Sequence, residues 1–446
     1  MPREGAVLAR LRLIATLPPP QHFAGCALDI ARDRIAALRA LGATVREFDT
    51  SAFYADDRAT LQPQIDDLRS FQADAVIGMP NAGYAVEIVV RDGSPEGEVR
   101  NLFLDVLALP TILYWDHPLV QSPKYVVPSW PSSPGESTDG VLGRIRRLMR
   151  HPLAVHFFPD SGQLSELRRL GVADFGGDRC FIHGVSAEFD EGHGVSPDER
   201  QDHLVAFFGN VRTGATRTIQ YEDPALTAVR ERALAVCMSD WDRPPYHAYR
   251  EAIGALEPDE RARLRLDVDQ SFYWRFLYDE VCVVANGEPR FRKVLSCGRP
   301  LTYFGGFADV ESRALAAEAG VTLASQYLPY GRALAAAYRR ARVSIDVVNA
   351  PFISGFSPKL LSCFASGGFM LTTRTADMRV ALGRLVDSIG FSSADQLADR
   401  VEYYLSRDRE RRELTREIQD VVGRHWTLAA QYGRTIPMAL DQLRRA

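Results

Sequence analysis

Residues 343–373 read VSIDVVNAPFISGFSPKLLSCFASGGFMLTT, and this stretch decides the fold. The apolar run 343–348 predicts a buried strand, and a loop of serine and glycine then leads into a helical pattern that opens at Pro358. Proline suits a first helical turn because its missing N–H would have no partner there, and Ser357 suits the N-cap. A second apolar run, 369–372, predicts the next strand. The pattern is typical of a parallel α/β sheet.

The same loop carries groups that bind a phosphate. The free amides and the positive end of the helix favour an anion, and Lys359 adds a full charge. Ser354 and Ser357 add hydroxyl donors, and Gly355 permits close approach of a ligand. Taken alone, these residues fit an ordinary capped helix with a solvated Lys359 better than an anion site, because short motifs recur by chance.

Strands and helical patterns alternate on both sides of this unit. A weakly patterned stretch, 181–201, divides the chain and predicts a hinge near residue 195. The alternation predicts an α/β fold with two Rossmann-like domains facing a cleft, since ligands bind at the carboxyl ends of parallel strands. The main predicted strands are 11–17, 44–48, 75–79, 111–115, 155–158, 203–208, 301–304 and 343–348.

Composition limits the class of protein. A length of 446 residues suggests two or three domains, and a net charge of −4 argues against a nucleic-acid partner. A basic run favours a solvated helix face; the alternative is a patch that docks an anionic membrane surface or an anionic acceptor. This run consists of Arg144, Arg146, Arg147 and Arg150. Nothing in the composition indicates an oligomeric state.

The cysteines and the N-terminal stretch bear on location. The 6 cysteines form no C-x-x-C pair, which indicates reduced thiols. The apolar stretch 6–17 is interrupted by Arg10 and Arg12, so it predicts a buried strand rather than a signal peptide or a membrane span. We therefore expect a cytoplasmic protein.

The segment 343–373 resembles the C-terminal domain of GT-B glycosyltransferases, in particular the family-1-like group called spore-maturation-protein or CgeB-type. In that group a glycine-containing loop precedes a basic residue that opens a helix, as Gly355 and Lys359 do here. The helix ends in a small-residue run, here 365–368, before a strand that ends in threonine. The stretch 424–434 resembles the element that leads into a C-terminal helix crossing back to the first domain.

The resemblance implies a domain plan and an activity. Residues 1–192 would form the acceptor-side domain, 193–425 the nucleotide-sugar-binding domain, and 426–446 the helix that packs back on the first domain. The enzyme would move a sugar from a UDP-, GDP- or dTDP-linked donor to a hydroxyl of a glycan, protein or small molecule. We expect no metal and no cofactor, because backbone amides and a guanidinium can stabilise the leaving diphosphate.

The donor site is predicted in the second domain. Many retaining GT-B enzymes carry two glutamates eight positions apart, the second on the ribose, and Ser354 and Ser362 stand at these positions. A serine hydroxyl binds more weakly than a carboxylate, so the stereochemistry stays open. The predicted donor-binding residues are Gly209, Asn210, Arg212, Ser354, Gly355, Phe356, Ser357, Lys359 and Ser362. Replacing Lys359 with Ala is expected to weaken nucleotide binding.

The first domain is predicted to hold the acceptor and the base. His117 follows a predicted strand with Asp116 beside it, and a histidine has a pKa suited to deprotonating a hydroxyl. The alternative is a histidine that caps the strand end or packs on Trp115. The predicted acceptor-side residues, each also compatible with a purely structural loop role, are His22, Asn81, Gly83 and Tyr84.

Two other functions remain open at this point. A nucleotide-sugar 2-epimerase would keep the fold and change the reaction. A non-catalytic module that binds a glycan or a partner is motivated by the serines Ser354 and Ser362 at the glutamate positions.

Overall fold

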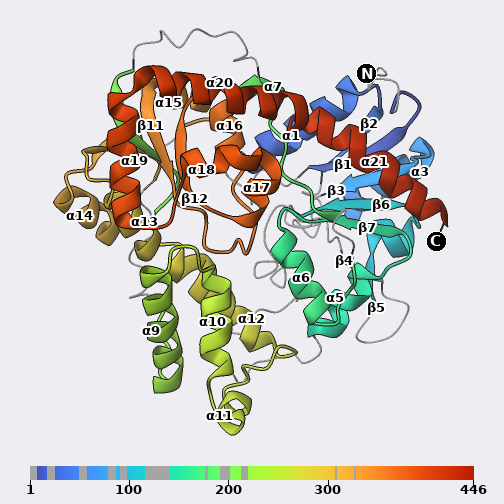
Figure 1. Ribbon diagram of the computed structural model, residues 1–446. Helices are drawn as coiled ribbons and strands as arrows, with labels where there is room; N and C mark the ends of the chain where they lie inside the picture. The colour runs from blue at the N-terminus through green and yellow to red at the C-terminus, as the bar shows by residue number, and fades with distance from the viewer. Residues whose placement is uncertain are drawn as a thin grey trace.

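The computed structural model describes residues 8–17, 26–49, 58–78, 87–90, 98–115, 141–175, 179–190, 201–211, 219–306, 309–325 and 328–445. Within these ranges the chain forms two parallel sheets, each flanked by helices (Figure 1). The prediction of two Rossmann-like α/β domains is confirmed.

The first domain is built on a five-stranded sheet in the order β2-β1-β3-β6-β7, and every neighbouring pair is parallel. Its central strands β3 and β6 are buried throughout and mostly apolar, as expected where helices cover both faces of a sheet. The elements are β1 Arg12–Leu17, α1 Cys26–Ala40, β2 Thr44–Asp49, α3 Arg58–Phe71, β3 Ala75–Gly78, β4 Glu87–Val90, β5 Glu98–Asn101, the π-helical turn Leu102–Val106, β6 Thr111–Tyr114, α5 Val141–Met149, β7 Ala154–Phe157, α6 Ser161–Arg169 and α7 Ala187–Asp190.

The second domain has a six-stranded parallel sheet in the order β10-β9-β8-β11-β12-β13. Strand order reverses between β8 and β11, and in this architecture the carboxyl ends at such a point form the ligand crevice. Its strands are β8 His203–Phe208, β9 Leu301–Phe304, β10 Thr322–Ser325, β11 Ala341–Asp346, β12 Met370–Thr373 and β13 Gly390–Phe391. Its helices are α9 Pro224–Ser239, α10 Pro245–Gly254, α11 Pro258–Arg263, α12 Ser271–Leu277, the π-helix Tyr278–Ala285, α13 Glu288–Leu295, α14 Val310–Glu318, α15 Arg332–Arg340, α16 Lys359–Ala365, α17 Ala376–Leu382, the 3-10 turn Gly383–Leu385, α18 Val386–Ile389, α19 Ala394–Ser406 and α20 Asp408–His425.

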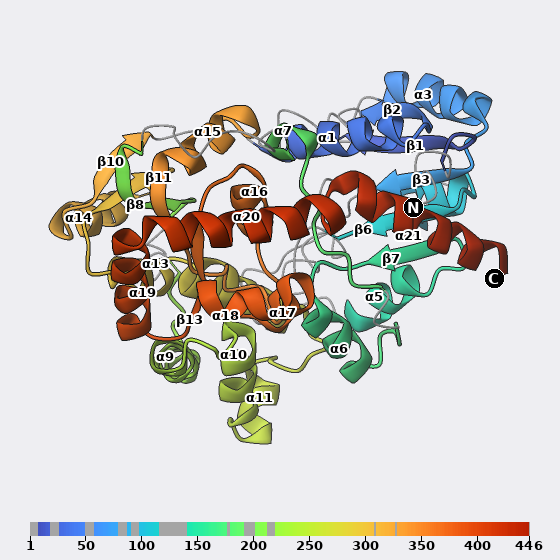
Figure 2. The ribbon, with the colours of Figure 1, turned by 45° about the horizontal axis from the view of Figure 1, so that its top comes forward.

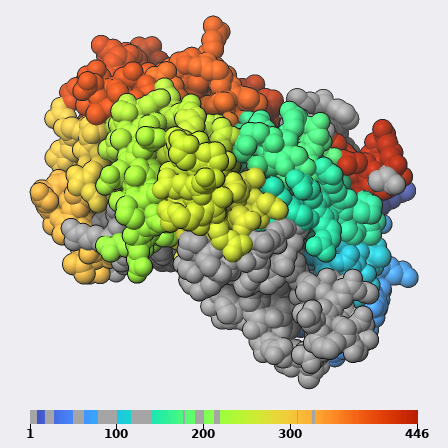
Figure 3. Space-filling model, turned by 90° about the horizontal axis from the view of Figure 1, so that it is seen from below, coloured from blue at the N-terminus to red at the C-terminus, as the bar shows by residue number. Residues whose placement is uncertain are grey.

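A helical insertion, α9 to α12, lies between β8 and β9 and projects beyond the sheet (Figure 1). Its buried aromatic residues, such as Tyr249 and Trp274, share one apolar core with Ile145 of α5 and Leu167 of α6. Figure 3 shows the insertion, in green and yellow, lying directly against α5 and α6 in teal. The second domain therefore reaches the first through this insertion as well as through the main crossing.

The last helix, α21 Leu428–Arg445, crosses back to the first domain, as predicted (Figure 2). The ring of Tyr432 stacks on Phe181, and Thr435 shares a hydrogen bond of 2.7 Å with the hydroxyl of Tyr114 in β6. The crossing is tight: a Cβ added at Gly184 would meet the Leu428 backbone nitrogen at 2.7 Å. Over the described ranges, none of the helices combines the length and apolarity that a bilayer span needs.

Candidate active site

A pocket of about 660 Å³ lies at the carboxyl ends of β11 and β12. Four segments form its walls: the turn 241–245 of the helical insertion, α13, the loop 348–354, and the residues from 373 into α17. The loop is the one that the sequence predicts as a ligand loop, whereas the helical wall was not foreseen.

The pocket is strongly cationic. Among its lining residues Asp242 is the acid, and the cations are Arg243, Arg290, Lys293, Arg374 and Arg379. Three of these arginines have acidic partners: Arg243 pairs with Glu251, Arg290 with Asp346 and Arg379 with Asp387.

Lys293 and Arg374 differ from the other three cations. Lys293 is 8% exposed, and its Nζ lies 5.2 Å from the ring centroid of Trp241. Within the described ranges it has no acid at ion-pair distance, and burial lowers its pKa to about 8. The Nε of Arg374 is buried without a hydrogen-bond partner among the described residues, while its Nη2 donates to Gln396 Oε1 at 3.0 Å. A buried donor without a partner is costly, so these two groups indicate an anionic ligand.

Lys359 lies beside the first loop of the second domain, as predicted, but its charge is already paired. Its Nζ donates to Asp346 Oδ1 at 2.6 Å and to the carbonyl of Phe208 at 3.2 Å. A Cβ added at Gly209 would lie 3.7 Å from this Nζ, so the two predicted residues are neighbours at the switch between β8 and β11. Burial lowers the pKa of Lys359 although Asp346 opposes the shift. The expectation of a solvated Lys359 is wrong.

The other described donor residues are dispersed. Ser354 lines the pocket, whereas Phe356 and Ser362 are buried in the domain core and are not among the lining residues. The hydroxyl of Ser357 accepts from the Lys359 amide at 3.3 Å, although the helix begins one residue later than predicted. Asn210 accepts from the Gly306 amide at 3.3 Å and so closes the loop after β8.

Several predicted residues lie outside the described ranges: Asp116, His117, His22, Asn81, Gly83, Tyr84 and Arg212. The strand end that precedes His117 is held by Trp115. Its Nε1 donates to His156 Nδ1 at 3.1 Å, and its ring stacks on the ring of Phe158. His156 is fully buried, and desolvation lowers its pKa to about 3. His156 is therefore neutral near pH 7 and acts as a structural residue.

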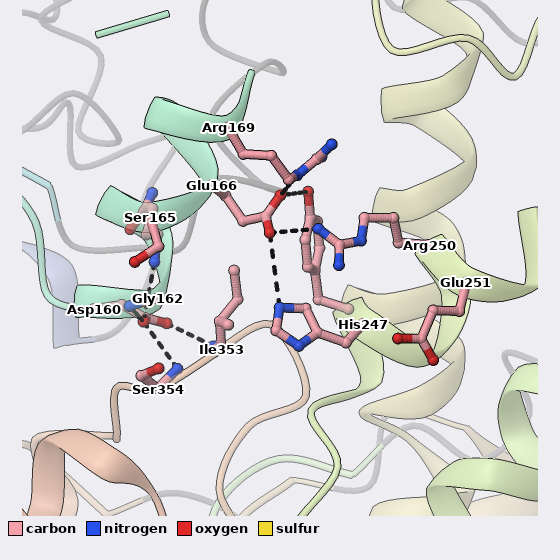
Figure 4. Close-up of polar contacts among 12 residues, drawn as sticks. Asp160, Gly162, Ser165, Glu166, Arg169, His247, Arg250, Glu251, Ile353 and Ser354 are labelled. Atoms are coloured by element: carbon pink, nitrogen blue, oxygen red, sulfur yellow. Dashed lines mark hydrogen bonds and ion pairs between the residues drawn. The ribbon is translucent and has the colours of Figure 1, made fainter. Parts of the chain in front are cut away.

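The sequence also missed a polar contact between the domains. Asp160, ahead of α6, accepts from the backbone amides of Ile353 at 2.6 Å and Ser354 at 2.9 Å (Figure 4). Asp377 in α17 accepts from the amide and hydroxyl of Ser161 at 2.8 and 2.5 Å. An aspartate between a strand and a helix predicts an N-cap, but no local pattern indicates a partner nearly 200 residues away, since Asp160 and Ile353 are 193 positions apart.

Residues 283–435 match the family model described as glycosyl transferase-like. The second domain is a glycosyltransferase domain. The match includes α13 and the ligand loop, so both walls that carry Lys293 and Ser354 belong to it. The predicted family and the enzyme class are confirmed, and the spore-maturation subgroup stays a prediction.

Similarity to solved structures extends over nearly the whole chain at low identity. A glycosyltransferase from Rickettsia africae ESF-5 is 10% identical with a TM-score of 0.49, covering 98% of this chain and 99% of that one. Anabaena Alr3699/HepE in complex with UDP and glucose is 8% identical with a TM-score of 0.47, covering 97% and 100%. Sucrose-phosphate synthase from Thermosynechococcus elongatus is 12% identical with a TM-score of 0.45, covering 96% and 99%. A search of curated proteins finds no match.

In the domain that faces the glycosyltransferase domain, the basic run has a structural role. Arg146 of α5 and Arg150, just after this helix, donate to the carbonyls of residues 170–172 at distances of 2.8 to 3.2 Å. They satisfy the free carbonyls at the end of α6, where positive charge is favoured. The side chains of Arg146 and Arg150 are thus held against the end of α6, while Arg147 and Arg150 are exposed, as the solvated face predicts. The alternative of a patch that docks an anionic surface stays a prediction.

In the described part of the chain, no group of three or more His, Cys, Asp or Glu side chains is arranged so that it could hold a metal ion. The two Asp-x-Asp triplets, 240–242 and 267–269, bind backbone amides. Asp240 accepts from the Asp242 amide at 3.1 Å, and Asp269 accepts from the Leu142 amide at 3.1 Å.

Proposed function

We propose that the protein transfers a sugar from a nucleotide-diphosphate sugar to a hydroxyl group, and that the donor binds in the 660 Å³ pocket. The observation that carries this proposal is a pair of cations in a pocket at the carboxyl ends of parallel strands. Among the described residues, Lys293 has no acid at ion-pair distance and the buried Nε of Arg374 has no hydrogen-bond partner. A volume of this size suits a ligand of drug or cofactor dimensions. A diphosphate would supply the anion that both groups lack.

The pocket's chemistry fits the departure of a nucleoside diphosphate. Negative charge grows on the diphosphate as the bond to the sugar breaks, and fixed donors in a water-poor site stabilise that charge. Lys293 and Arg374 would carry this role, with the hydroxyl of Ser354 as a further donor. His117, with Asp116, remains our proposed base for the acceptor hydroxyl, and Arg212 a proposed diphosphate contact. Titration with nucleoside diphosphates identifies the nucleotide, and assays with nucleotide sugars identify the sugar.

The direct test is calorimetric titration of the protein with UDP, GDP and dTDP, followed by assay of the matching nucleotide sugars. We expect one nucleoside diphosphate to bind with 1:1 stoichiometry. Absence of binding by all three would overturn the placement of the donor. Release of a new sugar isomer without acceptor would point to a 2-epimerase, and binding without any turnover to the non-catalytic module.

The affinity for the nucleoside diphosphate should depend on pH through Lys293. Its pKa of about 8 leaves it charged below that pH, and above it the ligand must bind together with a proton. We therefore expect constant affinity from about pH 7 to 8 and a fall of up to about tenfold per pH unit above. Calorimetry across this range measures it, and a flat profile to pH 9.5 would remove Lys293 from the site.

We propose that Lys359 supports binding of the nucleotide sugar, directly or through its neighbours, at the switch between β8 and β11. Replacing Lys359 with Ala should reduce the affinity for the nucleoside diphosphate by roughly tenfold, the usual loss for one charge-assisted hydrogen bond. Because Asp346 loses a partner, the melting temperature must be measured beside the affinity. Unchanged affinity in folded protein would remove Lys359 from the donor site and leave the pocket assignment intact.

A further inference from the structure

The N-terminus of α6 contacts the ligand loop from the other domain. The carboxylate of Asp160 caps its own helix, because Oδ1 accepts from the amides of Gly162 at 2.9 Å and Gln163 at 3.3 Å. The same carboxylate reaches across to the glycosyltransferase domain, with Oδ1 accepting from Ser354 and Oδ2 from Ile353 (Figure 4). One fully buried side chain thus binds backbone groups of both domains.

Asp377 of the second domain makes a second polar contact between the domains. Asp377 accepts from the amide and hydroxyl of Ser161, and its own amide donates to the Ser354 carbonyl at 3.0 Å. Ser354 is therefore held on its N–H by Asp160 and on its carbonyl by Asp377. Both sides of this loop residue are fixed by hydrogen bonds.

The two domains approach so closely here that a side chain at either of two glycines would clash. A Cβ added at Gly162 would meet Ile353 Cγ2 at 2.5 Å and Ser354 Oγ at 2.7 Å. A Cβ added at Gly355 would meet the Pro159 carbonyl oxygen at 2.6 Å. Gly355 thus allows close approach of the other domain's backbone, whereas the sequence suggested approach of a ligand. Gly162 and Gly355 therefore allow the two domains to pack in close van der Waals contact.

Further along α6, a second acid holds the opposite wall of the pocket. Glu166 is 5% exposed and accepts from Arg250 of α10 at 2.6 Å, while His247 Nε2 lies 3.8 Å from it (Figure 4). Helix α10 begins at Pro245, which lines the pocket. One helix of the first domain therefore touches both the loop wall and the helical wall.

We propose that Asp160 is a positioning residue for the donor: from the acceptor-side domain it holds the ligand loop in the shape that lines the pocket. This proposal rests on the proposed function, since it takes the pocket as the donor site. Both residues whose amides it binds, Ile353 and Ser354, line the pocket. The consequence is that the donor site is complete only while the two domains are in contact, which couples donor affinity to the acceptor-side domain.

The charge on Asp160 makes the contact sensitive to pH. Burial raises its pKa to about 6, and Asp377 of α17 raises it further while the amide bonds oppose the shift. Cys180 also faces both acids, and Arg434 of α21 faces Cys180; the pKa of the Cys180 thiol is raised, so it stays neutral. The amide bonds lower the pKa of the buried carboxyl, so by linkage they favour its charged form. A proton taken up below about pH 6 therefore weakens these bonds while Asp160 stays buried, and the loop should loosen, although the raised pKa itself favours the folded chain at acid pH.

Asp160→Asn separates the helix cap from the loop contact. The side-chain oxygen of asparagine can keep the bonds at Oδ1, but its NH₂ group would then face the Ile353 N–H, where two donors meet. We expect α6 to stay formed and the dissociation constant of the nucleoside diphosphate to rise by about tenfold. We also expect the donor KM to rise more than kcat falls, and the affinity below pH 6 to fall less steeply than in wild type, leaving only the loss due to protonation of the diphosphate itself.

Asp309→Asn is the matched control, since Asp309 caps α14 with a bond of 2.7 Å from the Ser312 amide and does not line the pocket. It should leave the nucleotide affinity unchanged. Gly355→Ala is the second variant: it displaces the loop without changing charge and should raise the same dissociation constant.

Three outcomes decide between the two proposals. If wild-type protein binds no nucleoside diphosphate, the proposed function fails. If wild type binds and both Asp160→Asn and Gly355→Ala bind equally well, the positioning role of Asp160 is wrong and the donor site stands. If Asp160→Asn lowers kcat and the folded fraction while the donor KM and the acid limb of the pH profile are unchanged, Asp160 is only structural and the positioning role is likewise wrong.

Discussion

Asp346→Asn should lower the free energy of unfolding by roughly 3–5 kcal/mol, the typical cost of removing one partner from a buried ion pair. Asp346 is 1% exposed, and its Oδ1 accepts from Lys359 at 2.6 Å and from Arg290 at 3.1 Å. Burial lowers the pKa of both cations while Asp346 opposes the shift. Without the carboxylate, two buried positive charges would face each other at the switch between β8 and β11.

Denaturant unfolding monitored by circular dichroism measures this loss. The matched control is Asp387→Asn, because Asp387 also pairs with an arginine, Arg379, but both side chains are about half exposed, at 50% and 52%. An exposed pair of this kind contributes less than about 1 kcal/mol. Equal losses in the two variants would contradict a central role for Asp346 in the second domain.

Lys293→Met should act in opposite directions on binding and on stability. The affinity for the nucleoside diphosphate should fall by about 10- to 100-fold, the value of one buried charge-assisted contact to a phosphate. The unligated protein should become more stable by roughly 1 kcal/mol. The depressed pKa shows that desolvation destabilises the Lys293 ammonium more than nearby charges stabilise it. Below about pH 8 the charged Lys293 destabilises the folded protein by a constant amount. This destabilisation decreases as pH rises from 8 toward the pKa of Lys293 in the unfolded chain.

Arg292→Met is the control for that experiment. Arg292 lies on the same helix, next to Lys293, and pairs with Glu288 at the surface at 2.7 Å. Its loss should change neither the affinity nor the stability by a measurable amount. If Lys293→Met binds the nucleotide as wild type does, the anion site is elsewhere. If it is less stable than wild type, the contact with Trp241 outweighs the cost of burial.

The sheets could be predicted because their signal is local. An apolar run followed by turn residues and a helical pattern recurs along the chain, and strands β8, β11 and β12 lie within two residues of their predicted places. The sequence predicts Ser357 as the N-cap because a cap depends only on its next few neighbours; the N-cap position is Pro358 instead, although the Ser357 hydroxyl accepts from the Lys359 amide. The enzyme class followed from the segment 343–373, which lies within the matched residues 283–435.

The candidate site was harder to predict because its partners are distant in sequence. Lys359 was expected to meet a ligand, yet Asp346, 13 positions earlier, pairs with it. Lys293 and Arg374, separated by the strands β9 to β12, gave no pattern that would join them. Buried charge depends on what packs around it, and that packing comes from a helical insertion whose docking on α6 has no sequence signature.

By itself, then, the sequence determined two parallel α/β sheets, the ligand loop after β11 and the family to which residues 283–435 belong. These depend on periodicity, turn chemistry and caps, which act over a few residues. The packing of the folded chain settles which pocket cations lack an acid among the described residues, and that Asp160 of one domain binds the ligand loop of the other. Desolvation and hydrogen-bond satisfaction depend on three-dimensional neighbours, and these neighbours exist only once the chain has folded.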